Sequence, residues 1–416
     1  MKSTLQFGKT NKDTMNSPTL RFRTPRNTAD QLGQVFTPSS VSRLLAAALP
    51  CKSRQIIDMG AGQGALATAA LAQCTDANAI LIEQDPIQVD FLRRLDRRRF
   101  AIISADALAP GLIERSIDNM ANLVVVSNPP YGMIRINRSL LKEESLLNTV
   151  VDGAGWVRGD AAFVSRIWEA TGNGTTLGLI VASPIICAGT FKSFRKTIVQ
   201  RMNNLVVTEL HPRAFSGAEV RTFLLTGSRT VNRSRRVTLR LANEHGEIIK
   251  EMQISHLQAV QRLDYLYHST VEDFKLRPGQ LVGNLEDLKA TIARGSRSPS
   301  EFRKLGHLAF HTSDFVKTGK LIKFPGAPAG FNSAKAGDIL IPRVGSRCLL
   351  REAKVISGTG LITDCVYRIR APMASRGAIW RTLNSDFGRE WRNRFSEGSC
   401  ARYLTISSIN SLPILL

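Results

Sequence analysis

Short apolar runs alternate with stretches of helical periodicity from about residue 31 to residue 230. The runs are rich in Ile, Val and Leu and end at Gly, Pro, Asn or Asp, as buried strands do, and they cover residues 55–62, 78–85, 100–106, 122–131, 176–184 and 204–212. Strands alternating with helices predict a Rossmann-like, doubly wound α/β sheet. A further apolar run at residues 222–231 predicts an antiparallel edge to that sheet.

This alternation stops after about residue 231, and the chain continues with an amphipathic helix at residues 256–268 and then with short strands and loops. Such a mixture is typical of a separate α+β unit. We therefore predict an α/β domain at residues 31–231 and an α+β domain at residues 232–416. Residues 1–30 are polar and basic without a period that could bury one face, which predicts a flexible arm.

The charge of the chain points to a polyanionic partner. The formal net charge is +22 and the isoelectric point is about 10.3, which is extreme for a chain of 416 residues and favours nucleic acid. The six cysteines and six histidines show no spacing typical of a zinc site, so no metal is expected. No apolar run is long enough to span a membrane, and the polar start lacks a secretion signal, so we expect a cytoplasmic protein with no membrane contact.

A glycine-rich turn follows the first predicted strand, and an acid follows each of the first three. The turn and its preceding acid are Asp58, Gly60, Gly62 and Gly64. Glycine allows positive φ and lets a ligand approach the backbone closely. Glu83 ends the second strand, where a carboxylate can accept hydrogen bonds from both hydroxyls of a ribose, and Asp106 ends the third. Together these residues predict a nucleoside-containing cofactor at the carboxyl edge of the sheet.

The fourth predicted strand ends in Asn128, Pro129, Pro130 and Tyr131. Proline cannot donate to a strand ladder, and its fixed φ stiffens the turn. Such a corner can aim the side-chain oxygen of Asn128 and the carbonyl of Pro129 at one amino group, which turns the nitrogen lone pair toward an electrophile. Tyr131 offers a flat face to a planar substrate. These residues predict a catalytic site that modifies a nitrogen atom beside the cofactor.

These motifs resemble those of the gamma-class DNA adenine-N6 methyltransferases, which use S-adenosylmethionine. The resemblance covers roughly residues 31–230 and follows the order of the family's segments. It implies a cofactor site with Phe36, Thr37 and Pro38 over the methionine part, Asp58, Gly60 and Gly62 beneath it, Glu83 at the ribose, and Asp106 and Ala107 at the adenine. It also implies that an adenine flipped out of double-stranded DNA lies between Tyr131 and Phe215 while the methyl group transfers directly to N6.

The second unit is similar to the target-recognition domains of type I restriction specificity subunits and of related fused methyltransferases. The resemblance rests on residues 331–370 and on the C-terminal ISSINSLPIL. It implies DNA contacts from basic side chains, for which the candidates are Arg343, Arg347, Arg368 and Arg370. We expect a monomer in a restriction-modification or related host or phage modification system, with a separate restriction endonuclease as a candidate partner.

Other substrates and other classes of protein stay open at this point. The same Asn-Pro-Pro-Tyr corner serves enzymes that methylate cytosine N4, an RNA base or a protein glutamine, because all these substrates present a planar nitrogen. The Phe-Thr-Pro segment before the glycine turn and the large basic second unit favour DNA. A noncatalytic DNA-binding protein is the alternative of another class, although Asn128 and Tyr131 are both present. No nuclease cluster of carboxylates with lysine is evident.

Overall fold

The computed structural model describes residues 35–416 except 51, 96–97, 120–121, 144, 216–219, 231–235, 276–280, 399–400 and 416. The arm predicted at residues 1–30 lies outside the described residues. No helix in the described part of the chain is long and apolar enough to cross a membrane.

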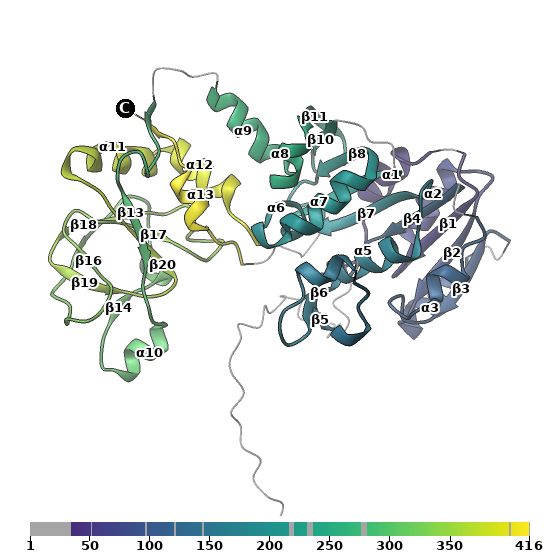
Figure 1. The fold of residues 1–416 in the computed structure, drawn as a ribbon, viewed down its shortest axis with the longest axis horizontal. Coiled ribbons are helices and arrows are strands. Elements are labelled where there is room, and N and C mark those ends of the chain that lie inside the picture. Colours follow the sequence, from purple (N-terminus) through teal and green to yellow (C-terminus); the bar gives the residue numbers. More distant parts are fainter. Residues whose placement is uncertain are drawn as a thin grey trace, which may run out of the picture.

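The N-terminal half is built on one sheet of nine strands in the order β11-β10-β8-β9-β7-β4-β1-β2-β3 (Figure 1). The strands are β1 Gln55–Met59, β2 Asn78–Glu83, β3 Phe100–Ser104, β4 Leu123–Ser127, β7 Thr176–Ala182, β8 Met202–Glu209, β9 Thr222–Arg229, β10 Arg236–Ala242 and β11 Ile248–Ser255. Strands β3, β2, β1, β4 and β7 are parallel, and β9 runs antiparallel between β7 and β8. The predicted doubly wound sheet is confirmed.

Helices cover both faces of this sheet, so its central strands are buried on both sides. They are α1 Ser39–Ala47, α2 Ala65–Gln73, α3 Pro86–Leu92, α4 Leu112–Arg115, α5 Gly159–Ala170, α6 Ser183–Cys187, α7 Lys192–Arg201 and α8 His256–Gln261. Successive strand side chains point to opposite faces. Ile56 accordingly packs in the cluster that contains Leu45 of α1, and Ile57 packs in the cluster that contains Ile167 of α5. This explains why β1 and β4 consist of unbroken buried residues.

The sheet continues beyond the boundary that we predicted near residue 232. β10 pairs in parallel with β8 and antiparallel with β11, so this hairpin forms the edge of the sheet. The predicted antiparallel edge exists, but β10 and β11 form it, whereas the run at 222–231 is the interior strand β9. The sheet therefore extends to Ser255, beyond residue 232, and Ala259 of α8 still packs in its core.

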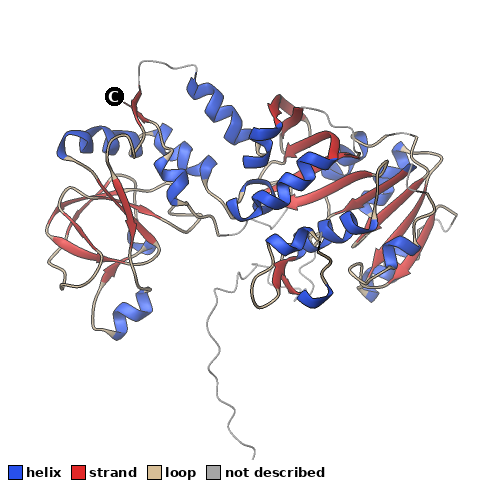
Figure 2. Ribbon diagram, viewed as in Figure 1, coloured by secondary structure: helices blue, strands red, loops and turns tan. Residues whose placement is uncertain are grey.

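The C-terminal unit is α+β, as predicted, with three of its helices above the strands and one short helix below them in the view of Figure 2. Its two larger sheets have the orders β13-β20-β17-β18-β15 and β14-β19-β16, and β12 pairs with β21. The strands are β12 Leu281–Gly283, β13 Thr291–Arg294, β14 Ala309–Phe310, β15 Lys320–Lys323, β16 Ser333–Lys335, β17 Ile339–Pro342, β18 Ala353–Ser357, β19 Thr359–Ile362, β20 Val366–Arg370 and β21 Ile414–Leu415. The helices are α9 Tyr265–Lys275, α10 Pro299–Lys304, α11 Met373–Leu383, α12 Asp386–Phe395 and α13 Ile406–Asn410.

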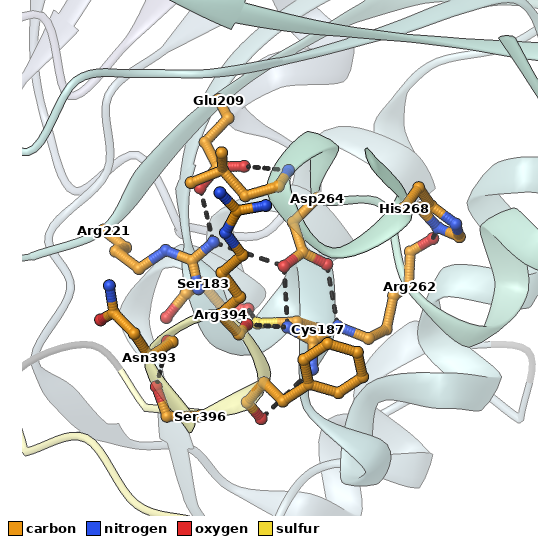
Figure 3. A network of polar contacts seen from close by, with 12 residues as sticks. Ser183, Cys187, Glu209, Arg221, Arg262, Asp264, His268, Asn393, Arg394 and Ser396 are labelled. Atoms are coloured by element: carbon orange, nitrogen blue, oxygen red, sulfur yellow. Dashed lines mark hydrogen bonds and ion pairs between the residues drawn. The ribbon is translucent and has the colours of Figure 1, made fainter. Parts of the chain in front are cut away.

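A buried network of charged side chains joins the two units (Figure 3). Asp264, between α8 and α9, has no solvent exposure and accepts two hydrogen bonds from Arg262, at 2.8 and 2.7 Å. Its Oδ2 also lies 3.3 Å from Arg221, which pairs with Glu209 at the end of β8. Arg262 in turn donates to the carbonyl of Arg394, 3.3 Å away at the end of α12. The network thus ties the nine-stranded sheet to the last helices of the chain.

Candidate active site

The glycine-rich turn after β1 forms the floor of the site. Gly60 and Gly62 have φ values of 69° and 52°, a left-handed conformation that residues with a Cβ adopt at a cost. The N–H groups of Gly60 and Ala61 donate to the carbonyl of Ile82, at 2.9 and 3.0 Å, which holds the turn against the end of β2. The ring of Phe36 lies about 3.6 Å from the point that a Cβ on Gly62 would occupy, so the segment before α1 covers the turn.

Glu83 is held rigidly at the end of β2. Its Oε2 accepts the Gly62 N–H at 2.7 Å, and its Oε1 accepts the N–H groups of Gln84 and Asp85 at 2.8 and 2.9 Å. These three backbone donors fix a carboxylate that is almost fully buried, and Oε2, which accepts only one of them, keeps a second lone pair. Glu83 is therefore preorganised to accept a hydroxyl group at Oε2.

Asp58 is buried beneath the turn, and one of its oxygens has no partner among the described residues. Its Oδ2 accepts the Ala67 N–H of α2 at 3.1 Å, whereas Oδ1 is buried without a hydrogen bond. Burial raises the pKa of Asp58 to about 8, and the negative charge of Glu83 adds to this shift. With this pKa Asp58 carries a proton at neutral pH, and a cation placed beside Oδ1 would favour its charged form.

The Asn128 amide is oriented by the segment before α1. Its Nδ2 donates to the carbonyl of Val35 at 2.8 Å and to the hydroxyl of Thr37 at 3.0 Å. Because both N–H groups are used, Oδ1 is the atom left to accept a hydrogen bond. Sequence reasoning assigned Thr37 only to the cofactor, but its hydroxyl also holds the Asn128 amide. Donation by Nδ2 also polarises the amide and strengthens Oδ1 as an acceptor.

In this structure the acceptor Oδ1 is covered by Tyr131. The Tyr131 hydroxyl donates to Oδ1 of Asn128 at 2.7 Å. Burial raises the pKa of the Tyr131 phenol far above its usual range, so it keeps its proton. The Tyr131 ring is only 2% exposed and packs with Ala182 and Val220, whereas Phe215 is buried in a separate apolar cluster. The two rings assigned to a base sandwich are therefore not brought face to face here, and that role stays a prediction.

One cavity joins Asn128 and Pro130, in the corner after β4, to the glycine-rich turn after β1. It spans about 560 Å³ of space, part of it open to solvent, and is lined by the predicted residues Phe36, Gly60, Gly62, Glu83, Asp106, Ala107, Asn128 and Pro130. A neighbouring cavity of about 350 Å³ adds Thr37 and Asp58 to these. Pro38 and Pro129 line neither cavity, and Pro38 instead begins α1 as its N-cap.

Phe163 and Ile82 also line the larger cavity, and sequence reasoning did not single them out as site residues. Phe163 lies on α5, where its ring comes within 3.2 Å of the position of a Cβ on Gly60. With Ile82 it supplies apolar surface beside the polar groups. The sequence offered little indication of this role, because an aromatic residue on an amphipathic helix can equally be a residue of the hydrophobic core.

The arginines predicted to contact DNA are mostly occupied within the C-terminal unit. Arg370 pairs with Asp338 at 2.7 and 2.8 Å, Arg368 donates to the carbonyl of Ser333 at 2.7 Å, and Arg343 donates to the carbonyl of Asp364 at 2.8 Å. Arg347 is exposed on the turn after β17. The strand register explains this, because β20 pairs with β17 and so lies close to Asp338, immediately before that strand. A DNA role for these arginines stays a prediction.

The fold is a Rossmann-like α/β sheet, and the cavity is lined by residues that follow its parallel strands. The model of the N-6 DNA methylase family matches residues 22–275, more than half of the chain. The chain therefore belongs to the N-6 DNA methylase family, and its predicted class, an adenine-specific DNA methyltransferase with S-adenosylmethionine as the cofactor, is confirmed. The matched range ends well beyond residue 232, in line with the extent of the sheet.

Similar folds occur among solved structures, and the three named here are similar at low identity. A Listeria monocytogenes protein assigned to the class I S-adenosylmethionine-dependent methyltransferases is 19% identical, with a TM-score of 0.42, over 52% of this chain and 68% of that chain. The methyltransferase subunit of a type I restriction-modification system from Streptococcus thermophilus is 15% identical, with a TM-score of 0.43, over 59% of this chain and 54% of that chain. The EcoKI M protein is 14% identical, with a TM-score of 0.38, over 50% and 48%. No curated protein sequence matches the chain.

Proposed function

We propose that this chain methylates N6 of a flipped adenine at a specific site in double-stranded DNA, with the C-terminal unit selecting the site. The observation that carries the proposal is the single cavity that joins Asn128 and Pro130 to the glycine turn, Glu83 and Asp106. A methyl donor on this floor and an amine at this corner would meet within one space. We further propose that the protein acts as a cytoplasmic monomer beside a separate restriction endonuclease.

The residues around the cavities fit S-adenosylmethionine. The unpartnered Oδ1 of Asp58 suits the cationic methionine end, and the free lone pair on Oε2 of the backbone-fixed Glu83 suits a ribose hydroxyl. Phe163 and Ile82 would pack against the adenine ring beside Asp106 and Ala107. When bound, the cofactor supplies an electrophilic methyl group on a sulfonium. Asp58, Glu83 and the glycine turn would orient that methyl group toward the corner.

At the corner the amine of the target base would donate one hydrogen to Oδ1 of Asn128 and the other to the carbonyl of Pro129. Two acceptors held in place draw the nitrogen lone pair out of conjugation with the ring and aim it at the methyl group. Transfer needs no covalent enzyme intermediate, because the nitrogen attacks directly and then loses a proton. Tyr131 and Phe215 would have to leave their buried positions to stack on the base.

The proposal is tested by methylation-sensitive sequencing of DNA from cells that express the chain. Adenine marks at one short motif, absent with Asn128→Ala, would support it. An unmarked genome at good expression would favour RNA or protein as the substrate. Methyl groups on cytosine N4 would show that the target base is cytosine and not adenine. Methylation at all adenines would contradict site selection by the C-terminal unit.

Removing the Tyr131 hydroxyl is expected to favour substrate binding. In Tyr131→Phe the ring remains, but the 2.7 Å hydrogen bond to Oδ1 of Asn128 is lost, so the substrate amine no longer competes with the phenol. The KM for DNA should fall by about 2- to 10-fold, the equivalent of one neutral hydrogen bond, and kcat should change little. The free protein should lose about 1 kcal/mol of stability. Steady-state kinetics and urea unfolding measure these effects, and a rise in KM would contradict the competition.

The buried Asp58 is expected to make the free protein less stable as pH rises. Its pKa is about 8 in the folded state against 3.8 for the ordinary group, so between these values the folded protein holds a proton that the unfolded chain releases. The unfolding free energy should therefore fall between about pH 4 and pH 8, by up to about 1.4 kcal/mol per pH unit from this group. Urea unfolding across this range should show a shallower fall for Asp58→Asn, whose affinity for S-adenosylmethionine should also drop. If the unfolding free energies of the two proteins changed with pH in parallel, Asp58 would not be the source of the pH dependence.

A further inference from the structure

A two-stranded hairpin follows the catalytic corner directly, and one of its faces carries exposed apolar and cationic side chains. Its strands are β5 Met133–Arg135 and β6 Trp156–Arg158, which lie apart from the nine-stranded sheet at the lower side of Figure 1. Arg135 pairs with Trp156 across the strands, and directly opposed residues share a face. Met133 and Trp156 are 46% and 43% exposed, and Arg135 is exposed as well. We name Met133, Arg135 and Trp156 the wedge face.

The hairpin is fixed rigidly to the corner. On its opposite face Val157 is buried and Ile134 packs against the same core cluster as α5. The N–H of Gly159 donates to the carbonyl of Gly132 at 2.7 Å, and a Cβ at Gly159 would lie only 2.4 Å from the carbonyl oxygen of Pro130. The backbone of the hairpin and that of the corner are therefore in direct contact, and any movement of one would displace the other.

A buried ion pair anchors the end of the hairpin. Arg158 and Asp160 lie 3.0 Å apart and are both largely inaccessible to solvent. Oδ2 of Asp160 also accepts the N–H of Ala182, the last residue of β7, at 3.1 Å. Arg158 is thus held in the protein, whereas its neighbours Met133, Arg135 and Trp156 remain at the surface. An exposed tryptophan on a rigid support has little conformational entropy to lose when it binds.

The position and chemistry of the wedge face suit duplex DNA at the flipped nucleotide. Met133 follows Tyr131 by two residues, so their Cα atoms lie within about 7 Å. Extruding a base exposes the faces of the neighbouring bases, and an apolar side chain inserted there offsets the lost stacking. Trp156 and Met133 are the side chains of this kind next to the corner, and Arg135 beside them can meet a phosphate. The net charge of +22 agrees with a polyanionic partner.

We propose that the wedge face inserts Trp156, supported by Met133, against the base stack that the target adenine leaves, with Arg135 on an adjacent phosphate. This inference rests on the proposed function of the corner, because it needs a base to leave a helix. It goes beyond that function by assigning the step that keeps the DNA open to residues outside the cofactor and amine sites.

The test uses the full chain and duplexes that contain the motif methylated by the wild type. One duplex carries 2-aminopurine at the target position, which fluoresces when it is unstacked. Trp156→Ala should lower this fluorescence and weaken binding by about 5- to 100-fold, the range expected for losing one stacking contact. Trp156→Phe should retain most of both. A duplex with an abasic site opposite the target, where the base is already unpaired, should restore methylation by Trp156→Ala.

The matched control is Ile249→Ala. Ile249 is an apolar residue on β11, in the hairpin at the edge of the nine-stranded sheet, and its side chain is 54% exposed. This variant should behave as the wild type does. Unchanged affinity for S-adenosylmethionine in Trp156→Ala would show that the variant is folded. If that variant flips and methylates the duplex like the wild type, the wedge is wrong while the proposed function stands. If the wild type methylates no DNA, the proposed function and the wedge fail together.

Discussion

Replacing Asn128 by alanine is expected to lower kcat for methyl transfer by about 100- to 1000-fold, the cost of losing one preorganised polar group in an active site. The side chain supplies Oδ1 as an acceptor, and its orientation is fixed by donation to Val35 and Thr37 at 2.8 and 3.0 Å. Alanine leaves the Pro129 carbonyl alone at the corner, so the amine can rotate back into conjugation. The affinity for S-adenosylmethionine should change by only a few fold, because Asp58 and Glu83 remain.

Single-turnover kinetics and cofactor titration separate these two effects. The matched control is Asn148→Ala, because Nδ2 of Asn148 also donates to two carbonyls, those of Lys142 and Glu143, both at 2.8 Å, but at an exposed site. This control should keep wild-type kcat. If Asn128→Ala lost cofactor binding, or if Asn148→Ala lost as much activity, the loss in Asn128→Ala would reflect a disturbed fold and not a lost hydrogen bond to the substrate amine.

Replacing Arg262 by alanine is expected to destabilise the protein by about 3–5 kcal/mol, since it leaves a buried carboxylate without its principal partner. Asp264 has no solvent exposure, and apart from Arg262 its partner in the network is Arg221 at 3.3 Å. Burial acts to raise the pKa of Asp264, but the charge and hydrogen bonds of Arg262 outweigh burial and hold that pKa at about 2. The loss should appear as a lower midpoint in urea unfolding.

An exposed pair gives the control for this prediction. Arg93 and Asp90 lie 3.0 Å apart on α3 and just after it, and both side chains are more than half exposed. Arg93→Ala should change stability by less than about 1 kcal/mol, because water solvates the remaining carboxylate. The double replacement Arg262→Met with Asp264→Leu should recover much of the loss. Equal destabilisation by Arg93→Ala and Arg262→Ala would refute the special cost of burial.

The elements that sequence reasoning predicted well are those determined by neighbouring residues. The runs that form β1, β2 and β4 are apolar because both of their faces are buried. The sequence shows this directly as stretches of consecutive apolar residues. The glycine turn was also predictable from the sequence, because the positive φ values at Gly60 and Gly62 restrict which residues fit there. The acids at the ends of β1 and β2 followed, because parallel strands bring their carboxyl ends to one edge.

Pairing between distant segments was not visible in the same way. β10 joins the sheet by pairing with β8, from which the whole of β9 separates it in sequence, and no local pattern states which strand will be its neighbour. The predicted boundary near residue 232 missed this hairpin for that reason. The same holds for Arg370, whose partner Asp338 comes from another part of the chain.

The sequence by itself thus determined the class of sheet, the glycine turn and the stiff Asn-Pro-Pro-Tyr corner, because each depends on a short motif whose backbone geometry only certain residues allow. Only the tertiary structure decided that Tyr131 covers Asn128, that Thr37 orients the same amide, and that the wedge face stands beside it. These contacts join residues far apart in the chain or depend on how much surface is left exposed, and both follow from packing rather than from local order.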